Sequence, residues 1–184
     1  MKKLWKLAIF LAIGAIAVPS TSNAASPEDT LYLDLKDGRV VIEMFPDLAP
    51  THVARIKELA RKGFYDGLTF HRVMDGFMAQ TGDPMGDGTG GSGKKLKAEF
   101  NQTHHVRGVT SMARSPAGYD TADSQFFIML GDNKGLDGQY TAWGRVISGM
   151  EFVDRIKKGD ERRDGAVVNP DKIVRLRIAA DVKE

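Results

Sequence analysis

Residues 70–83 read FHRVMDGFMAQTGD and combine several kinds of side chain within one short stretch. The stretch carries a His-Arg pair, two Phe, two Met, a Gln and two Asp. This mixture is too polar for a fully buried strand and too apolar for a solvated loop. Three kinds of site fit it: a metal site, a nucleophile with its base, or a groove that holds a ligand with apolar and polar parts. The rest of the chain has to distinguish among them.

The first 24 residues have the pattern of a secretory signal peptide. Three lysines among the first six residues are followed by an apolar run of about 12 residues that ends at Val18. Ser22 and Ala24 are the small residues expected before a cleavage site. The run is shorter than the roughly 20 residues that a spanning helix needs, which disfavours the alternative of an uncleaved N-terminal anchor. We expect cleavage before Ala25 and export, most simply to a bacterial periplasm.

Composition limits the classes of partner. The segment 1–24 contains three of the 26 basic residues and none of the 24 acidic ones. The mature chain, residues 25–184, would therefore carry a net charge of about −1, which argues against a nucleic-acid partner and against membrane binding after cleavage. The chain has no cysteine, which excludes disulfides, thiolate catalysis, cysteine-bound metals and a lipoprotein anchor. Its length suits a single domain with a core of its own.

Hydrophobic periodicity predicts many short strands and a helix in the first half of the chain. Residues 31–44 read as a β-hairpin with Asp37 and Gly38 in the turn. Residues 49–63 read as a helix, with Pro50 suited to its first turn. Further β-rich runs lie at residues 68–80, 109–113, 124–130, 141–147 and 172–179.

A second helix is expected late in the chain. Ser148 and Glu151 have the spacing of a capping box, and the pattern continues to Gly159. Short strands without a βαβ alternation, together with two helices, indicate a closed antiparallel barrel or a sandwich with the helices outside. No repeat or linker divides residues 25–184, so one domain is predicted.

The glycine-rich loop at residues 82–93 contains look-alikes of two nucleotide-binding motifs, G-x-G-x-x-G and the P-loop. Both motifs place phosphate at the N-terminus of a following helix. The segment that follows here, KKLKAEFNQ, is short and poorly periodic, and Lys95 occupies the place of the magnesium-binding Ser or Thr. We therefore interpret the glycines as positions where the backbone turns tightly or approaches a ligand.

The histidines and serines do not form a recognisable catalytic or metal motif. His52, His71, His104 and His105 lack the H-x-H and H-x-x-x-H spacings, so neither a metal nor another cofactor is predicted. No G-x-S-x-G sequence is present, which disfavours a serine hydrolase. The groove is the remaining interpretation of residues 70–83.

Four further blocks, GDGTGG, VTSMA, SQFFI and LDGQYTAWGRV, make the pattern specific. With FHRVMDGFMAQTGD they resemble the cyclophilins, which are peptidyl-prolyl cis-trans isomerases, in order from about Leu31 to Ile178. The resemblance implies a mainly β fold: a closed eight-stranded antiparallel β-barrel capped by two α-helices. It also implies a monomer that acts on proline-containing unfolded or flexible polypeptides without a cofactor, and a role as a folding helper or chaperone for exported proteins.

The resemblance implies roles for individual residues. Arg72 matches the catalytic arginine, Gln80 matches the residue that steadies it and binds the substrate backbone, and Phe77 matches a catalytic wall of the proline pocket. His71 is expected to be structural. The positions that match substrate-binding residues of the proline pocket and the adjoining groove are Met78, Gly88, Ala113, Arg114, Gln125, Phe127, Leu136 and Tyr140.

Three positions depart from the better-known family pattern. Gly135 replaces a common Trp, Tyr140 replaces a common His, and Arg114 replaces a common Asn. The first two change the rim of the pocket, so weak cyclosporin binding is expected. Two rival functions are a peptide-binding module without catalysis and a small-molecule-binding barrel. Arg72 and Gln80 favour the isomerase, because binding alone needs no donor at the prolyl nitrogen.

Overall fold

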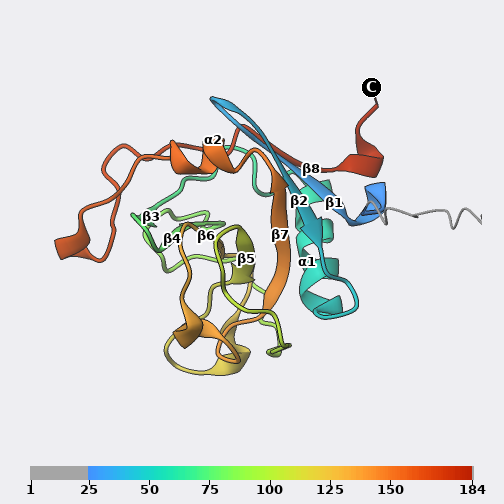
Figure 1. Cartoon of the computed structure of the whole chain (residues 1–184), viewed down its shortest axis with the longest axis horizontal. Coiled ribbons are helices and arrows are strands. Elements are labelled where there is room, and N and C mark those ends of the chain that lie inside the picture. Colours follow the sequence, from blue (N-terminus) through green and yellow to red (C-terminus); the bar gives the residue numbers. More distant parts are fainter. Residues whose placement is uncertain (1–24, 184) are drawn as a thin grey trace, which may run out of the picture.

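The computed structural model describes residues 25–183, so the expected signal peptide lies outside the described residues. Within that range, eight antiparallel strands and two α-helices build the fold (Figure 1). The mainly β class with two helices is thereby confirmed. The strands are β1 (Thr30–Leu35), β2 (Gly38–Met44), β3 (Arg72–Met74), β4 (Met78–Thr81), β5 (Val109–Met112), β6 (Phe126–Met129), β7 (Ala142–Ser148) and β8 (Arg175–Ile178). The helices are α1 (Pro50–Arg61) and α2 (Met150–Asp154).

The strands form one curled sheet in the order β3-β4-β6-β5-β7-β2-β1-β8. The expected closed barrel is not confirmed, since no ladder among residues 25–183 joins the edge strands β3 and β8. The segments that precede β3 and β8 are connected by an isolated bridge, Thr69 with Lys172, and by a few backbone hydrogen bonds. The outer edge of β3 is instead occupied by the backbone near Gly165, whose carbonyl accepts from Val73 N–H at 2.8 Å. The sheet is therefore an open half-barrel.

The β1–β2 hairpin and α1 enclose the main core. Leu31 lies opposite Ile42 and Leu33 lies opposite Val40, and all four side chains are fully buried. Burying each such side chain contributes about 1.5–3 kcal/mol. In Figure 1, α1 lies beside β8. The expected apolar stripe of α1 faces this core, with Ile56 at its centre and no exposed surface. No helix among residues 25–183 is long and apolar enough to cross a membrane.

The second helix differs from the sequence prediction. Ser148 is the last residue of β7, so it forms no capping box, and α2 ends at Asp154, well before Gly159. Gly149 caps the helix in the left-handed region, with φ of 82°. The backbone turns there against β2, and a Cβ at Gly149 would lie 2.3 Å from the carbonyl oxygen of Arg39. The turn before α2 is therefore set by a close backbone approach that only glycine permits, and no side chain caps the helix.

Gly149→Ala should consequently destabilise the protein strongly. The left-handed backbone alone costs a residue with a Cβ about 1–2 kcal/mol, and the clash with β2 adds to it, for a total of about 3 kcal/mol or more. Urea unfolding of both proteins measures the difference. Gly67→Ala is the matched control, because Gly67 has φ of 79° but open space around its would-be Cβ. Equal losses in the two variants would show that the contact with β2 has no energetic weight.

Candidate active site

The hairpin of β3 and β4 supplies the central part of the site. Arg72 lies opposite Gln80 across the antiparallel pair, and Met74 lies opposite Met78. Side chains alternate between the faces of a strand, so the intervening Val73 points the other way and is fully buried in the main core. The arginine, the glutamine and the two methionines therefore share the face that the main core leaves free.

A second apolar cluster lies on this same face. Strand β4 pairs with β6, which places Phe127 opposite Gln80 and Met129 opposite Met78. Met78, Phe127 and Met129 have exposed fractions of only 1%, 4% and 0%. The partly buried hydrophobic residues packed against this second cluster are Met74, Phe77, Ala113, Leu136 and Tyr140. The sheet is thus apolar on both faces in this region.

This cluster walls a cavity of about 150 Å³. Phe127 contacts Tyr140 edge to face, with ring centroids 5.6 Å apart. Every lining residue is one that the sequence nominated for the site. They are Arg72, Phe77, Met78, Gln80, Ala113, Arg114, Phe127, Leu136 and Tyr140. The structure thus brings these predicted residues together around one cavity, with Arg72 among its lining residues.

Arg72 is held at the rim of this cavity by partners on two sides. Its Nη1 donates to Oε1 of Gln80 at 3.2 Å and lies 3.7 Å from Sδ of Met78. Its opposite edge faces Asp164: Nη2 donates to Oδ1 at 2.8 Å and Nε donates to Oδ2 at 3.1 Å. The hydrogen bonds from Arg72 hold the pKa of the Asp164 carboxyl below its usual value. The guanidinium therefore has a defined orientation.

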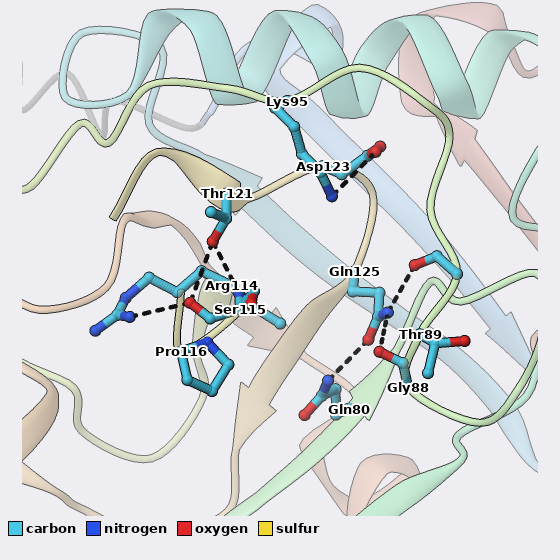
Figure 2. Close-up of a pocket in the computed structure, with 12 residues that line it drawn as sticks. Gln80, Gly88, Thr89, Lys95, Arg114, Ser115, Pro116, Thr121, Asp123 and Gln125 are labelled. Carbon is cyan, nitrogen blue, oxygen red and sulfur yellow. Dashed lines mark hydrogen bonds and ion pairs between the residues drawn. The ribbon is translucent and has the colours of Figure 1, made fainter. Parts of the chain in front are cut away.

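A chain of amide hydrogen bonds continues from Gln80 away from the cavity (Figure 2). Nε2 of Gln80 donates to Oε1 of Gln125 at 2.9 Å. Nε2 of Gln125 in turn donates to the carbonyl oxygens of Gly88 at 3.0 Å and Gly90 at 2.8 Å. Because each amide is fixed by its neighbour, Oε1 of Gln80 stays turned toward Arg72. Gln80 thus joins Arg72 to Gln125 through its side-chain amide.

A second, larger cavity of about 320 Å³ adjoins the first. The two cavities share Gln80, Ala113 and Arg114. Figure 2 shows Arg114, Ser115 and Pro116 along one side and the two glutamines along the other. The lining residues are Gln80, Gly88, Thr89, Gly90, Lys95, Ala113, Arg114, Ser115, Pro116, Thr121, Asp123 and Gln125. The structure thus brings Gly88 and Gln125 to this neighbouring groove and not to the apolar cavity.

The glycine-rich loop is fixed by carboxylates of the protein itself. Asp83 accepts hydrogen bonds from three backbone N–H groups of this loop, including that of Gly88 at 2.5 Å. Asp123 accepts from the N–H groups of Ser92 and Gly93. A Cβ at Gly90 would lie 2.1 Å from Oδ1 of Asp83. The backbone of this loop therefore closely approaches the carboxylates of Asp83 and Asp123.

Arg114 separates the two cavities and is held by two tyrosines. Its guanidinium carbon lies 4.8 Å from the ring centre of Tyr119 and 4.7 Å from that of Tyr140. Nε of Arg114 donates to the carbonyl oxygen of Gln139 at 3.0 Å. The hydroxyl of Tyr119 donates to Oε1 of the same Gln139 at 3.2 Å. Arg114 and Tyr140, two of the positions that depart from the better-known family pattern, therefore contact each other.

The histidines have structural partners or surroundings. Burial lowers the pKa of His71 below its usual value. Burial also lowers the pKa of His105, opposed by its hydrogen bond with Asp137, while its Nε2 lies 3.1 Å from the hydroxyl of Ser111. Nδ1 of His52 lies 2.8 Å from a carboxylate oxygen of Glu99. Among residues 25–183, no group of three or more potential metal-ligating side chains is close enough to hold an ion.

Sequence reasoning missed Asp164 and Tyr119. Asp164 lies 92 positions from Arg72, in a polar segment without periodicity. Its only local signal is the Asp-Gly pair that it forms with Gly165, which indicates a turn and not a partner. Tyr119 follows the loop after β5 and is itself exposed, so no burial pattern in the sequence marks it as a partner of Arg114. Neither contact leaves a pattern in the sequence.

The comparisons with known proteins agree with this geometry. The family model described as "Cyclophilin type peptidyl-prolyl cis-trans isomerase/CLD" matches residues 30–178. A probable peptidyl-prolyl cis-trans isomerase of Brucella suis is 52% identical over 187 aligned positions, covering 95% of this chain and 93% of the relative. Peptidyl-prolyl cis-trans isomerase B of Bacillus subtilis is 43% identical over 136 positions, covering 73% of this chain and 95% of the relative.

Solved structures of cyclophilins have a similar fold. The cyclophilin AquaCyp293 from Hirschia baltica superposes with a TM-score of 0.76 at 26% identity, covering 86% of this chain and 77% of that one. A cyclophilin-type isomerase from Cryptosporidium parvum, determined in the presence of the dipeptide Ala-Pro, gives 0.74 at 27% identity, covering 81% and 98%. The described chain is thus similar over nearly its whole length to known cyclophilin-type isomerases, and its structure places an arginine beside a cavity on a sheet of this topology. The chain belongs to the cyclophilin-type peptidyl-prolyl cis-trans isomerases.

Proposed function

We propose that Arg72, Gln80 and Phe77 catalyse rotation about X-Pro peptide bonds whose proline ring enters the 150 Å³ cavity. The observation that carries this proposal is the position of Arg72 Nη1, at the rim of a cavity whose other lining residues are mostly apolar or aromatic. A dry cavity of similar volume in another protein holds benzene, so a five-membered pyrrolidine ring is of suitable size. The Cryptosporidium parvum relative, determined in the presence of Ala-Pro, supports a proline-containing peptide as the ligand.

The reaction demands little chemistry from the protein. Amide resonance sets a barrier of about 18–20 kcal/mol for rotation, and X-Pro bonds isomerise over tens to hundreds of seconds. A turnover of about 10 per second corresponds to a barrier near 16 kcal/mol, so the enzyme has to supply on the order of 4 kcal/mol. No covalent intermediate is needed for a reduction of this size.

Arg72 can supply that stabilisation by donating a hydrogen bond. The twisted transition state loses amide resonance, which returns a lone pair to the prolyl nitrogen. A guanidinium N–H beside an apolar cavity can donate to this lone pair as a charge-assisted bond in surroundings with little water. Phe77, Met78, Phe127 and Leu136 hold the ring without polar demands while the acyl side rotates. The groove lined by Gly88, Ala113, Arg114 and Gln125 then holds the residues before proline.

Arg72→Ala should lower kcat/KM by at least tenfold, because the donor acts in the transition state. Activity of the wild type should be nearly flat from about pH 6 to 9, since guanidinium groups remain protonated there. A protease-coupled or NMR exchange assay on an X-Pro peptide measures both. Arg145→Ala, which removes an exposed arginine paired with Glu43 on the opposite part of the sheet, is the control. Wild-type turnover in folded Arg72→Ala would refute the catalytic assignment, and retained peptide binding with lost turnover would exclude a binding-only module.

We further propose that the clients are exported polypeptides and that the enzyme works in the periplasm as a monomer. The support is the signal-like sequence of residues 1–24, with its cleavage motif ending at Ala24. Proline isomerisation is slow enough to limit folding, so newly exported chains offer a suitable substrate.

The mature protein should accordingly begin at Ala25. Intact-mass analysis of protein recovered from the cell envelope measures the N-terminus directly. Fractionation of the same cells tests whether the mature form is in the periplasm. A main species that retains Met1 would contradict the signal-peptide interpretation and would favour an anchored protein.

Weak binding of cyclosporin is also proposed, on the basis of Gly135. The family members with a Trp at this position use it as an aromatic contact for the inhibitor at the pocket rim. Gly135 lies in the short 3-10 turn η3 (Lys134–Leu136), next to the cavity wall Leu136. Glycine offers neither an apolar surface nor an indole donor there. The walls of the proline cavity do not include position 135, so catalysis on short peptides should be independent of it.

Gly135→Trp should therefore increase sensitivity to cyclosporin while leaving turnover of short peptides nearly unchanged. Loss of an aromatic anchor at an interface typically costs about 2 kcal/mol or more, so the inhibition constant should tighten by roughly 30-fold or more. The new Cβ would lie 3.1 Å from Oδ1 of Asn133, a side-chain atom that can move. Gly135→Ala separates backbone effects from the indole. Equal inhibition of wild type and Gly135→Trp would show that this turn does not border the inhibitor.

A further inference from the structure

Asp164 accepts hydrogen bonds from the whole Nε–Nη2 edge of the Arg72 guanidinium. Nη2 of Arg72 donates to Oδ1 at 2.8 Å, and Nε donates both to Oδ2 at 3.1 Å and to the backbone oxygen of Asp164 at 3.0 Å. Such a fork-to-fork contact fixes the plane of the guanidinium as well as its position. The edge that carries Nε is consequently not available to a substrate.

The remaining N–H groups of Arg72 have unequal partners. A guanidinium carries five N–H donors and no acceptor. The second N–H of Nη2 faces Sδ of Met74, with 3.5 Å between the heavy atoms. Nη1 donates to Gln80 and otherwise faces Sδ of Met78 at 3.7 Å. Thioether sulfur is a weak acceptor, and Met78 lines the apolar cavity whereas Met74 does not. The N–H group that can donate a hydrogen bond to a ligand in this cavity is therefore on Nη1.

The backbone places Asp164 firmly against β3. Asp164 follows the 3-10 turn η4 (Glu161–Arg163) with φ of 52°, a region that Asp tolerates better than most residues. The next residue, Gly165, accepts a hydrogen bond from Val73 N–H at 2.8 Å. Val167 N–H donates to the carbonyl oxygen of His71 at 3.0 Å. These bonds flank Arg72 on both sides along the strand, so the carboxylate cannot move far from the guanidinium.

The ion pair has little to do with stability. The Asp164 side chain is 77% exposed, and exposed ion pairs typically contribute about 0–1 kcal/mol to folding. An arginine without such a partner samples many rotamers, and fixing it in one of them costs free energy that a pre-formed contact avoids. The geometry is thus better suited to orienting a donor than to holding the fold together.

We propose that Asp164 is a positioning residue for catalysis: by occupying the Nε edge of Arg72, it directs Nη1 into the proline cavity. This inference rests on the proposed role of Arg72 and adds to it a residue that lines neither cavity. Its effect should appear in kcat more than in KM, because the oriented N–H bonds to the prolyl nitrogen only when the amide is twisted.

The first test compares variants of Asp164 with a matched control. Asp164→Ala should lower kcat by about tenfold with little change in KM, in keeping with the sensitivity of catalysis to misplaced groups. Asp164→Asn keeps a neutral acceptor and tolerates the left-handed backbone, so it should recover part of the activity. Asp154→Ala breaks a comparable exposed pair with Arg107 (Nη2 to Oδ2, 2.6 Å), remote from either cavity lining, and should leave kcat unchanged. Thermal unfolding of each variant checks that the fold persists.

The second test is a double-mutant cycle on kcat/KM. If Asp164 acts through Arg72, Asp164→Ala should cause no further loss in the Arg72→Ala background. NMR should also show a protected Arg72 Nε–H signal in the wild type that exchanges faster in Asp164→Ala. If Asp164→Ala does not fold, the same cycle is run with Asp164→Asn. That variant should then lower kcat/KM several-fold in the wild-type background and cause no loss in the Arg72→Ala background.

The outcomes separate this inference from the proposed function. Full, additive loss in the cycle would overturn the positioning role, because Asp164 would then act independently of Arg72. Unchanged kcat in the folded Asp164 variants, alongside a loss in Arg72→Ala, would overturn this inference alone. An unchanged kcat/KM in Arg72→Ala would refute the catalytic role of Arg72, and the positioning role would fall with it.

Discussion

The register between β3 and β4 is the constraint on which the site depends. It sets Arg72 directly opposite Gln80 and directs both to the face that the main core leaves free. Side chains alternate along a strand, so a slip of one residue would turn the arginine into the core and expose Val73 instead. The complete burial of Val73 and Ala79 on the other face prevents that slip. Core packing thus fixes the position of the proposed donor.

The second constraint is that the sheet is apolar on both faces around β4 and β6. One face completes the main core, while the other carries the cluster around Met78 and Phe127 that walls the small cavity. An antiparallel sheet usually presents a solvated polar face on its outer side. Here the outer face stays apolar but is only partly covered, and an uncovered apolar concavity is the usual setting of a ligand site.

The sequence predicted the parts of this structure that leave a local or family-wide pattern. The β1–β2 hairpin follows from alternation around Asp37 and Gly38, and α1 follows from its apolar stripe after Pro50. The site residues followed from ordered blocks that resemble a known family, and the structure gathers them around two adjoining cavities. These features depend on residue type at fixed spacing, which a single sequence displays.

The predictions that were wrong depend on contacts between distant segments. Ser148 and Glu151 have a capping-box spacing, but the turn before α2 is decided by how closely Gly149 approaches β2. Closure of the barrel depends on what occupies the outer edge of β3, and that is the segment around Gly165 rather than β8. No periodicity in the sequence records either approach.

The same segment explains why Asp164 escaped prediction and what it contributes. Its neighbours bond to the backbone of β3, so an irregular loop rather than a strand borders the hairpin that carries Arg72. A regular strand there would present side chains of alternating direction, whereas the left-handed residue at position 164 lets both its carboxylate and its carbonyl face one guanidinium. The open edge of the half-barrel and the orientation of the proposed donor are therefore consequences of the same loop.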